Sequence, residues 1–384
     1  MTRPTCAFVD LDALRSNYRL ARQMHGGLAL AVIKANAYGH GAIQCAQALS
    51  SLADGFAVAI LDEAVTLREA GVRVPILVLE GVFSPEELRL AVALDLWLVV
   101  HSEEQIRMLE CRSAPPARLH IWLKIDTGMH RAGLDPRQVM SAHRRLVRSG
   151  RVRAITLMSH FACADDPDGA MTRTQIERFD RATALLPGPR SLCNSAGIAW
   201  WPEARRDWAR PGIMLYGAEP ARQSIPGLKP VMTFTSQIIA TRTLEAGESL
   251  GYGAAYTAPA RKRIGLVCAG YADGYPQNAP SGTPIAVDGQ RTTLVGRVSM
   301  DLITVDLTDL PGANPGSTVE LWGPQVPLNA IAEATGRLAY ELLCGVKRAP
   351  LTHRSREQVD PDRHRGVLTP KMDCCRPASL LGSP

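Results

Sequence analysis

A regular alternation of apolar runs and helical patterns fills residues 28–216 and strongly limits the folds open to this chain. Segments such as LDEAVTLREAG (61–71) and SPEELRLAVAL (84–94) have helical periodicity, and several begin at a serine cap. Eight βα units in about 200 residues predict an α/β fold with a closed (β/α)8 barrel of the TIM type, or else an open doubly wound sheet. The expected strands are residues 28–33, 55–60, 75–79, 95–100, 119–125, 152–159, 190–193 and 211–216.

The residue composition and pattern of the sequence change after Gly217. Residues 231–323 are rich in β-branched residues, glycine and proline, and turn signals such as Asp288-Gly289 recur. This pattern predicts a second, mostly antiparallel β domain. We therefore expect the barrel in residues 1–230, the β domain in residues 231–356, and a disordered tail in residues 357–384.

Composition excludes several classes of protein. The chain has 46% hydrophobic and 21% charged residues, and its net charge of +6 is interspersed along the sequence. An arginine-rich stretch at 144–153 lacks interleaved aromatic residues, so a solvated helix face is favoured over a nucleic-acid interface. Nine scattered cysteines without a CxxC pair indicate neither a metal site nor a disulfide framework. No signal peptide or membrane span is recognisable, and we expect a cytoplasmic protein.

Polar residues follow the predicted barrel strands. Because the C-terminal ends of barrel strands share one mouth, we expect these side chains to be neighbours. A lysine after a buried strand has its pKa lowered by burial, as Schiff-base chemistry requires. Each residue also has a structural interpretation, such as a helix cap for Asn194, and periodicity alone leaves open which end of its strand Arg210 occupies. The set comprises Lys34, Lys124, Arg131, His160, Asn194, Ser195, Arg210 and Tyr216.

Eight motifs, in order, resemble those of the bacterial alanine racemases, which bind pyridoxal phosphate. They are AVIKANAYGHG, LKIDTGMHRAG, SHFACAD, CNSAG, RPGIMLYG, LGYGAAY, GYADGYPQ and VGRVSMD, and they span both expected domains. The resemblance implies that Lys34 holds the cofactor as an aldimine and exchanges the α-proton on the D-alanine face. Tyr252 is then the base on the opposite, L-alanine face.

The resemblance also implies how the cofactor and substrate are held. Arg210 would face the pyridine nitrogen, and an arginine there leaves that nitrogen unprotonated. Lys124 would be carbamylated and would orient Arg131. The other cofactor-binding residues implied are Tyr38, His160, Asn194, Ser195, Gly212 and Ile213, and the substrate-side residues are Arg131, Met300 and, at the entrance, Tyr271.

Family members are homodimers in which the second domain closes the partner's site, so a homodimer is expected. D-alanine then serves either peptidoglycan synthesis or alanine catabolism. The alternatives are a racemase for serine or basic amino acids, a barrel-type decarboxylase with a cysteine in place of Tyr252, and a non-catalytic pyridoxal-phosphate carrier. Two departures from the family pattern stand out: Ala132 replaces a bulkier aliphatic, and Lys347 stands where some members present a tyrosine to the phosphate.

Overall fold

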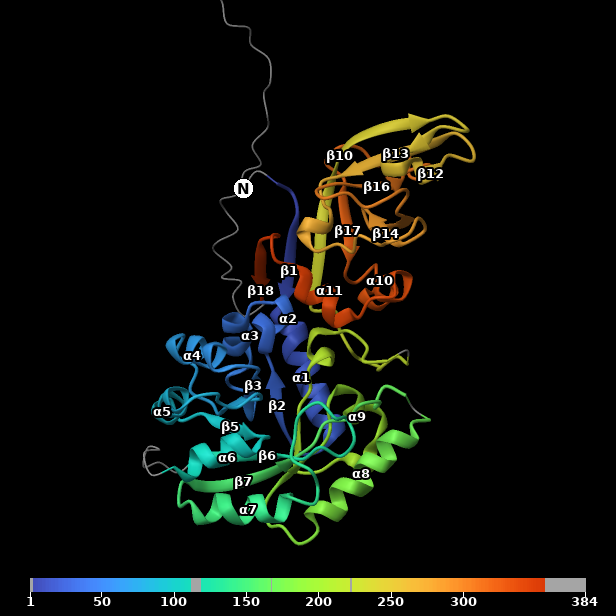
Figure 1. Ribbon diagram of the computed structural model, residues 1–384. Coiled ribbons are helices and arrows are strands. Elements are labelled where there is room, and N and C mark those ends of the chain that lie inside the picture. Colours follow the sequence, from blue (N-terminus) through green and yellow to red (C-terminus); the bar gives the residue numbers. More distant parts are fainter. Residues whose placement is uncertain (1–2, 112–118, 167, 222, 356–384) are drawn as a thin grey trace, which may run out of the picture. The chain divides into compact units, whose positions relative to one another are not determined.

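A closed barrel of eight parallel strands, β2 to β9, is the first of two β structures in this computed structural model (Figure 1). The structure describes residues 3–111, 119–166, 168–221 and 223–355, so the tail predicted at 357–384 lies outside the described residues. The predicted (β/α)8 barrel followed by a mostly antiparallel domain is confirmed. Among the described residues, no helix has the length and apolar character needed to cross a membrane.

Short strands line the barrel, and each is followed by a helix or helical turn. The register is parallel throughout, and β9 returns to β2 through Leu28 and Trp208 to close the ring. The strands are β2 (Leu28–Val32), β3 (Gly55–Val58), β4 (Ile76–Val78), β5 (Trp97–Val100), β6 (Leu119–Lys124), β7 (Val152–Met158), β8 (Arg190–Ser191) and β9 (Trp208–Ala209). The helices are α1 (Leu11–His25), α2 (Lys34–Gly39), α3 (Ala42–Leu49), α4 (Leu61–Glu69), α5 (Pro85–Ala93), α6 (Glu103–Glu110), α7 (Val139–Arg148), α8 (Ala170–Thr183), α9 (Ser195–Trp200) and the 3-10 turn η1 (Pro202–Ala204).

The predicted eighth strand at 211–216 is wrong. Those residues form a buried 3-10 turn, η2 (Ile213–Tyr216), and the strand is the preceding pair of residues in β9. Pro211 has no N–H for a strand ladder, and Gly212 turns the backbone away from the extended region at φ −118° and ψ −92°. Arg210 therefore follows its strand and belongs to the barrel mouth, which settles the position that periodicity left open.

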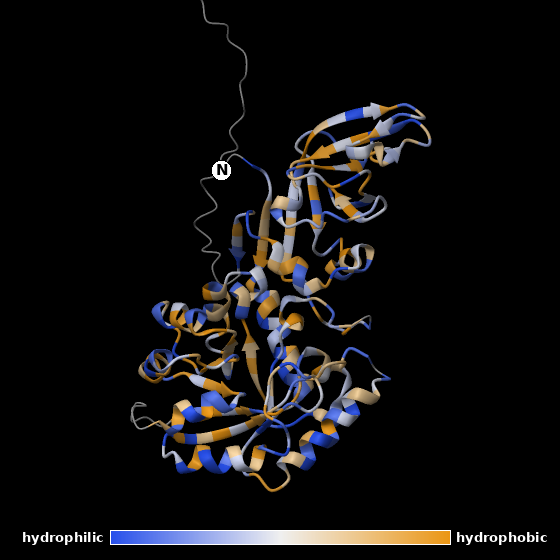
Figure 2. Cartoon of the chain, in the orientation of Figure 1, coloured by the Kyte–Doolittle hydropathy of each residue, from blue (hydrophilic) through white to orange (hydrophobic). Residues whose placement is uncertain are grey.

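Aromatic side chains fill part of the barrel interior. Trp122 of β6 lies 5.7 Å, centroid to centroid, from Trp208 of β9, and Trp97 of β5 also lies 5.7 Å from Trp208. Strands β5 and β9 are not neighbours in the ring, so these indoles meet across the inside of the barrel. The surrounding helices carry both hydrophilic and hydrophobic residues (Figure 2), as expected for helices with one face on the barrel.

The second sheet is organised around one long strand, β10 (Met232–Leu244), which pairs with β1, β13 and β17. Strand β1 (Cys6–Asp10) pairs antiparallel with β10 and parallel with β18 (Leu351–Arg354), so both ends of the described chain enter this sheet. The other elements are β11 (Ser249–Leu250), η3 (Tyr252–Ala254), β12 (Tyr256–Thr257), β13 (Lys262–Val267), η4 (Tyr271–Asp273), β14 (Pro284–Val287), β15 (Gln290–Thr293), β16 (Ile303–Asp306), β17 (Thr318–Trp322), α10 (Leu328–Thr335) and α11 (Ala339–Gly345).

Candidate active site

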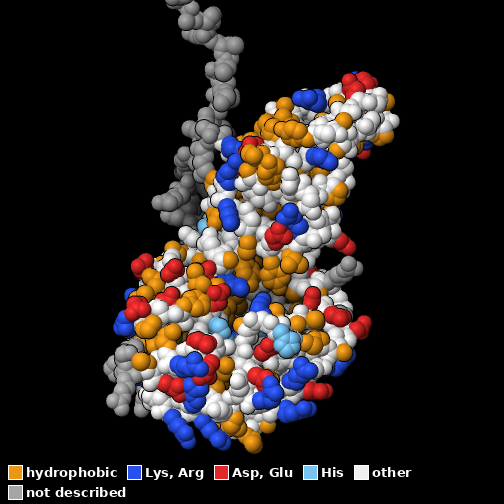
Figure 3. All heavy atoms as spheres, viewed as in Figure 1, with side chains coloured by type: hydrophobic (Ala, Val, Ile, Leu, Met, Phe, Trp, Pro, Cys, Tyr) orange, Lys and Arg blue, Asp and Glu red, His pale blue; other side chains and the backbone are white. Residues whose placement is uncertain are grey.

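The C-terminal ends of the barrel strands gather the basic residues that the sequence analysis selected. Lys34 follows β2, Lys124 ends β6, His160 follows β7 and Arg210 follows β9. We call these four residues the mouth cluster. The positive charges of Lys34 and Arg210 lie near enough to Lys124 and His160 to disfavour their protonation. Figure 3 shows basic side chains set in a hollow among hydrophobic ones on the face that it presents.

Lys34 is placed by an unusual backbone turn. The four residues after it, 35–38, have φ of 50° to 54° and ψ of 46° to 50°, which is a left-handed helical turn without glycine. Each such residue costs about 1–2 kcal/mol, and strain of this kind is concentrated at functional sites. The amide of Ala35 donates to Glu63 Oε1 at 2.6 Å, and Ala37 N donates to the carbonyl of Ile33 at 2.9 Å.

Arg210 is a buried cation, 4% exposed, for which the described residues provide no carboxylate partner. Its Nη2 donates to the carbonyl of Ser159 at 2.6 Å and lies 3.4 Å from His160 Nδ1, and its Nη1 donates to Ser191 Oγ. Burial lowers its pKa to about 10. Within the described residues its Nε–H makes no hydrogen bond, so one donor stays available to a ligand atom in the mouth.

The protonated, charged forms of Lys124 and His160 are both disfavoured. Burial lowers the pKa of Lys124 to about 8, and the charges of Arg210, Arg131 and Lys34 act in the same direction. Burial and the same cations also lower the pKa of His160 well below its usual value. At neutral pH His160 is therefore an uncharged hydrogen-bonding group, and Lys124 has a substantial neutral fraction.

A cradle of hydrogen-bond donors lies between α9 and η2. Ser195 Oγ accepts hydrogen bonds from the amides of Gly212, at 2.9 Å, and Met214, at 3.3 Å. The N–H of Ile213, the first residue of η2, has no partner inside the turn. A Cβ on Gly212 would meet the Tyr38 hydroxyl at 2.8 Å, so glycine allows this close approach.

Asn194 caps helix α9, which is the structural alternative to a cofactor-binding role that the sequence offered for it. Its Oδ1 accepts from the amide of Gly197 at 2.9 Å, at the N-terminus of α9. The cap fixes the start of the helix on which Ser195 is the first residue. Asn194 therefore contributes to the cradle through the placement of Ser195.

Three predicted residues lie on turns of the β domain and are exposed: Tyr252 at 73%, Met300 at 54% and Tyr271 at 37%. We call them the exposed trio. The amide of Tyr271 donates to the carbonyl of Ser299 at 3.1 Å, which ties two of the three turns together. Among the described residues no hydrogen bond joins the trio to the mouth cluster. Arg131, in the loop after β6, is also exposed.

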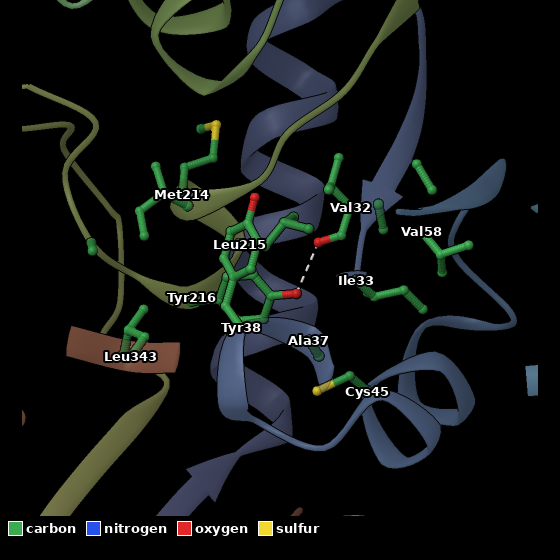
Figure 4. Packing of buried hydrophobic residues seen from close by; sticks show 14 of the residues in the cluster. Val32, Ile33, Ala37, Tyr38, Cys45, Val58, Met214, Leu215, Tyr216 and Leu343 are labelled. Carbon is green, nitrogen blue, oxygen red and sulfur yellow. Dashed lines mark hydrogen bonds between the residues drawn. The ribbon is translucent and has the colours of Figure 1, made fainter. Parts of the chain in front are cut away.

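Several residues of this region escaped the sequence analysis or received no role in it. Tyr216 had been placed in a strand. It contacts the Tyr38 ring at 4.8 Å between centroids and donates from its hydroxyl to the Val32 carbonyl at 2.9 Å (Figure 4). Tyr340 of α11 lies 5.8 Å from the Tyr38 ring. No periodic pattern in the sequence predicts that Tyr340 lies at this site, because α11 reaches the site from a distant part of the chain. His40 was visible only as part of a motif.

The donor set suits an organic anion, and no metal site appears in it. The part of the chain that the structure describes contains no group of three or more His, Cys, Asp or Glu side chains arranged to hold a metal ion. The mouth offers instead an amine, a free guanidinium N–H, and hydroxyl and amide donors in the cradle.

Comparison with known proteins gives a consistent result. The family description "Alanine racemase, N-terminal domain" matches residues 9–220, and "Alanine racemase, C-terminal domain" matches residues 231–353. A protein from Azoarcus sp. (strain BH72) named alanine racemase is 60% identical over 92% of this chain and 99% of its own length. The protein of Pseudomonas aeruginosa named "Alanine racemase, catabolic" is 53% identical over 91% of this chain and 98% of its own.

Solved structures agree. The biosynthetic alanine racemase from Pseudomonas aeruginosa superposes with a TM-score of 0.89 at 46% identity, covering 92% of this chain and all of that one. The alanine racemase from Bartonella henselae, described as having covalently bound pyridoxal phosphate, superposes with a TM-score of 0.82 at 29% identity, covering 91% of this chain and 99% of its own.

Proposed function

The chain belongs to the alanine racemase family of isomerases, and from that premise we propose that it interconverts L-alanine and D-alanine by proton transfer between two bases. The observation that supports this most strongly is the barrel mouth. There the fold brings an amine, a buried arginine and a cradle of donors together.

The residues of the mouth fit pyridoxal phosphate. The Lys34 amine would hold the cofactor's aldehyde carbon, and the free Nε–H of Arg210 would serve its pyridine nitrogen. The Tyr38 hydroxyl, Ser195 and the Ile213 amide would hold the phosphate, in the cradle where Gly212 permits a close approach. When bound, pyridoxal phosphate supplies an electron sink that acidifies the α-carbon of an attached amino acid.

The protein's own groups then move the proton. The Lys34 Nζ takes or returns it on one face of the α-carbon, and the Tyr252 hydroxyl does so on the other face. An acid and a base on opposite faces are what inversion requires, and each is effective when its pKa approaches the working pH. Arg210 keeps its own proton, because even its lowered pKa of about 10 lies above neutral pH.

Arg131 and Met300 hold the substrate carboxylate, and Lys124 orients Arg131. A lysine with a pKa of about 8 is partly neutral at physiological pH, and only a neutral amine adds carbon dioxide to form a carbamate. A carbamylated Lys124 carries a negative charge that pairs with the Arg131 guanidinium.

The protein acts as a homodimer, in which Tyr252, Met300 and Tyr271 complete the partner's mouth. Their exposure supports this arrangement, because large exposed side chains of this kind are available to be covered by a second chain.

The test is incubation of purified protein with L-alanine in heavy water, followed by chiral chromatography and mass spectrometry. L-serine, L-lysine and L-ornithine are run in parallel. We expect D-alanine with solvent deuterium at its α-carbon, and far slower turnover of the other substrates. Comparable turnover of serine or lysine would replace the proposal with a racemase of broad specificity. Deuterium incorporation without inversion would contradict the role of Tyr252.

A catabolic role is favoured by the high identity to the Pseudomonas aeruginosa protein named catabolic. A gene deletion in the source organism tests it. A catabolic enzyme predicts loss of growth on alanine as the carbon source without a requirement for added D-alanine. A D-alanine requirement would show instead that the enzyme supplies the cell wall.

A further inference from the structure

The left-handed turn at residues 35–38 joins the two ends of the proposed cofactor site. Lys34, at its start, would hold the aldehyde end, and the Tyr38 hydroxyl, at its end, lies beside Gly212 in the cradle that would hold the phosphate. The relative position of the two side chains is therefore set by four backbone conformations that L-residues rarely adopt. Such a turn persists only where its surroundings hold it.

His40 makes the side-chain contact that holds the end of this turn. Its Nδ1 lies 3.0 Å from the carbonyl oxygen of Ala37 and 2.9 Å from that of Tyr38. Carbonyl oxygens only accept hydrogen bonds, so Nδ1 carries the proton and donates to both. The Ala37 carbonyl also accepts from the His40 amide at 3.1 Å, whereas among the described residues no backbone amide donates to the Tyr38 carbonyl, so the imidazole provides the donor that this carbonyl lacks.

The His40 ring is locked in place and uncharged. It is fully buried, and burial lowers its pKa to about 4. Its Nε2 has no hydrogen-bond partner among the described residues. A neutral imidazole with Nδ1–H leaves only a lone pair at Nε2, which is the form that a buried position without a second acceptor tolerates.

Tyr216 connects His40 to the barrel strand that carries Lys34. The His40 and Tyr216 rings stack with centroids 4.5 Å apart and planes at 28°, and Tyr216 also contacts the Tyr38 ring. The Tyr216 hydroxyl donates to the carbonyl of Val32, the last residue of β2 (Figure 4). His40 thus holds the turn through hydrogen bonds to two of its carbonyls, and Tyr216 holds it by packing against the Tyr38 ring.

From this geometry we infer that His40 is a positioning residue, whose Nδ1–H holds the left-handed turn so that Lys34 and Tyr38 engage opposite ends of one cofactor molecule. The inference rests on the proposed function, since it needs pyridoxal phosphate at the mouth. His40 touches neither substrate nor cofactor, and its effect passes through the backbone of the turn.

The experiment compares two ligands of the cofactor-free protein, pyridoxal phosphate and pyridoxal, which lacks the phosphate. Binding is measured by absorbance and fluorescence titration. Pyridoxal would engage Lys34 and Arg210 but not the cradle, whereas pyridoxal phosphate would engage Lys34 and the cradle in register. The readout is the ratio of the two dissociation constants, which a general loss of stability leaves unchanged.

The variants are His40→Leu, which removes the donor, His40→Asn, whose amide places an N–H near Nδ1, and His40→Gln, whose amide reaches the Nε2 position. We expect the preference for pyridoxal phosphate to fall about tenfold in His40→Leu, on the scale of one lost hydrogen bond. His40→Asn restores most of it, and His40→Gln does not.

His25 offers a matched control. It is also buried, with a pKa near 4 and an unpartnered Nε2, but it ends α1 at the opposite end of β2. His25→Leu should leave the ligand ratio unchanged. If His40→Leu fails to fold, the Asn and Gln pair decides, and equal ratios in that pair overturn the inference. A wild-type ratio in folded His40→Leu also overturns it. Failure of the wild-type protein to bind pyridoxal phosphate would instead refute the proposed function.

Discussion

The mouth cluster and the exposed trio represent two ways of building a site. Arg210 is 4% exposed and donates to neighbouring strand ends, whereas Tyr252 is 73% exposed on a turn of the β domain. Burial lowers the pKa values of Lys124, His160 and Arg210 before any ligand arrives. The barrel therefore sets the chemistry of its own mouth.

The trio depends on something outside its own fold. Exposed side chains on turns keep much of their rotamer freedom, so they are poorly preorganised until another surface covers them. One half of the proposed site is therefore complete in a single chain, whereas the other half would become organised only in the proposed homodimer. Four predictions test this division.

The largest effect is expected at the mouth. Lys34→Ala removes both the covalent attachment and one base, so turnover should fall about 10⁴-fold or more. Steady-state racemisation and the loss of the absorbance of bound cofactor measure the change. Lys262→Ala, which breaks a half-buried pair with Asp306 in the β domain, is the control and should leave turnover nearly unchanged. A Lys34→Ala protein with turnover within tenfold of wild type would contradict the assignment.

A mixture of two inactive proteins tests whether the trio serves a second chain. Lys34→Ala and Tyr252→Phe homodimers are each expected to be inactive. Random reassortment after mild dissociation gives mixed dimers with one intact site, so activity should return to about a quarter of the wild-type value. Mixing each variant with itself is the control. Recovery of no activity, with subunit exchange confirmed by mass spectrometry, would place Lys34 and Tyr252 of one chain in the same site.

The dependence of stability on pH distinguishes the buried region from the exposed one. The folded protein releases the Lys124 proton near pH 8, whereas the unfolded chain keeps it to about pH 10.4. Between these values the unfolded state binds more protons, so the free energy of unfolding rises with pH. From pH 7 to pH 9 this group contributes about 1 kcal/mol to the rise.

Lys124→Met should reduce that rise by the same amount, measured by urea unfolding of cofactor-free protein in buffers free of carbon dioxide. Tyr252→Phe, a change at an exposed residue, is the control and should leave the rise of the free energy of unfolding with pH unchanged. Identical pH profiles for wild type and Lys124→Met would show that the amine is not desolvated.

The smallest expected effect concerns backbone strain at two alanines with positive φ. One lies in the mouth turn, where we expect the strain to matter for cofactor binding, and the other lies outside it. Ala35, in the mouth turn, and Ala254, beside Tyr252, have φ of 51° and 48°, and both are exposed. Changing either to glycine should stabilise the fold by about 0.5 kcal/mol, the relief of a left-handed alanine less the entropy of glycine. Only Ala35→Gly should weaken pyridoxal-phosphate binding. Equal effects of both variants on binding would contradict a special role for the mouth turn.

The sequence predicts the barrel well because its signal is local. Helical periodicity, serine caps and buried strands repeat along the chain, and the residue after each strand is then placed by the fold itself. That is why Lys34, Lys124 and His160 could be assigned to one mouth. The 211–216 segment misled because an apolar run buried on every side has the same composition in a strand and in a 3-10 turn.

Features that depend on contacts between distant parts of the chain could not be predicted from the sequence. The segment Ala35-Asn36-Ala37-Tyr38 contains no glycine to signal a left-handed turn, and its conformation depends on His40 and on helix α11 near the other end of the chain. The pairing of β1 with β10 and β18, rather than with the barrel, is decided by contacts far apart in sequence. The position of the trio in the proposed homodimer would likewise be a property of two chains.

The parallel pairing of β1 with β18 also affects the order of events during synthesis. Ala7 leaves the ribosome long before its partner Leu351, because more than 340 residues lie between them. Barrel units can close on neighbours as they emerge, whereas β1 keeps an open edge until residue 351 has been made. A chaperone that shields a short unpaired edge, or a slow codon ahead of residue 351, would therefore change the yield of native protein more than its stability.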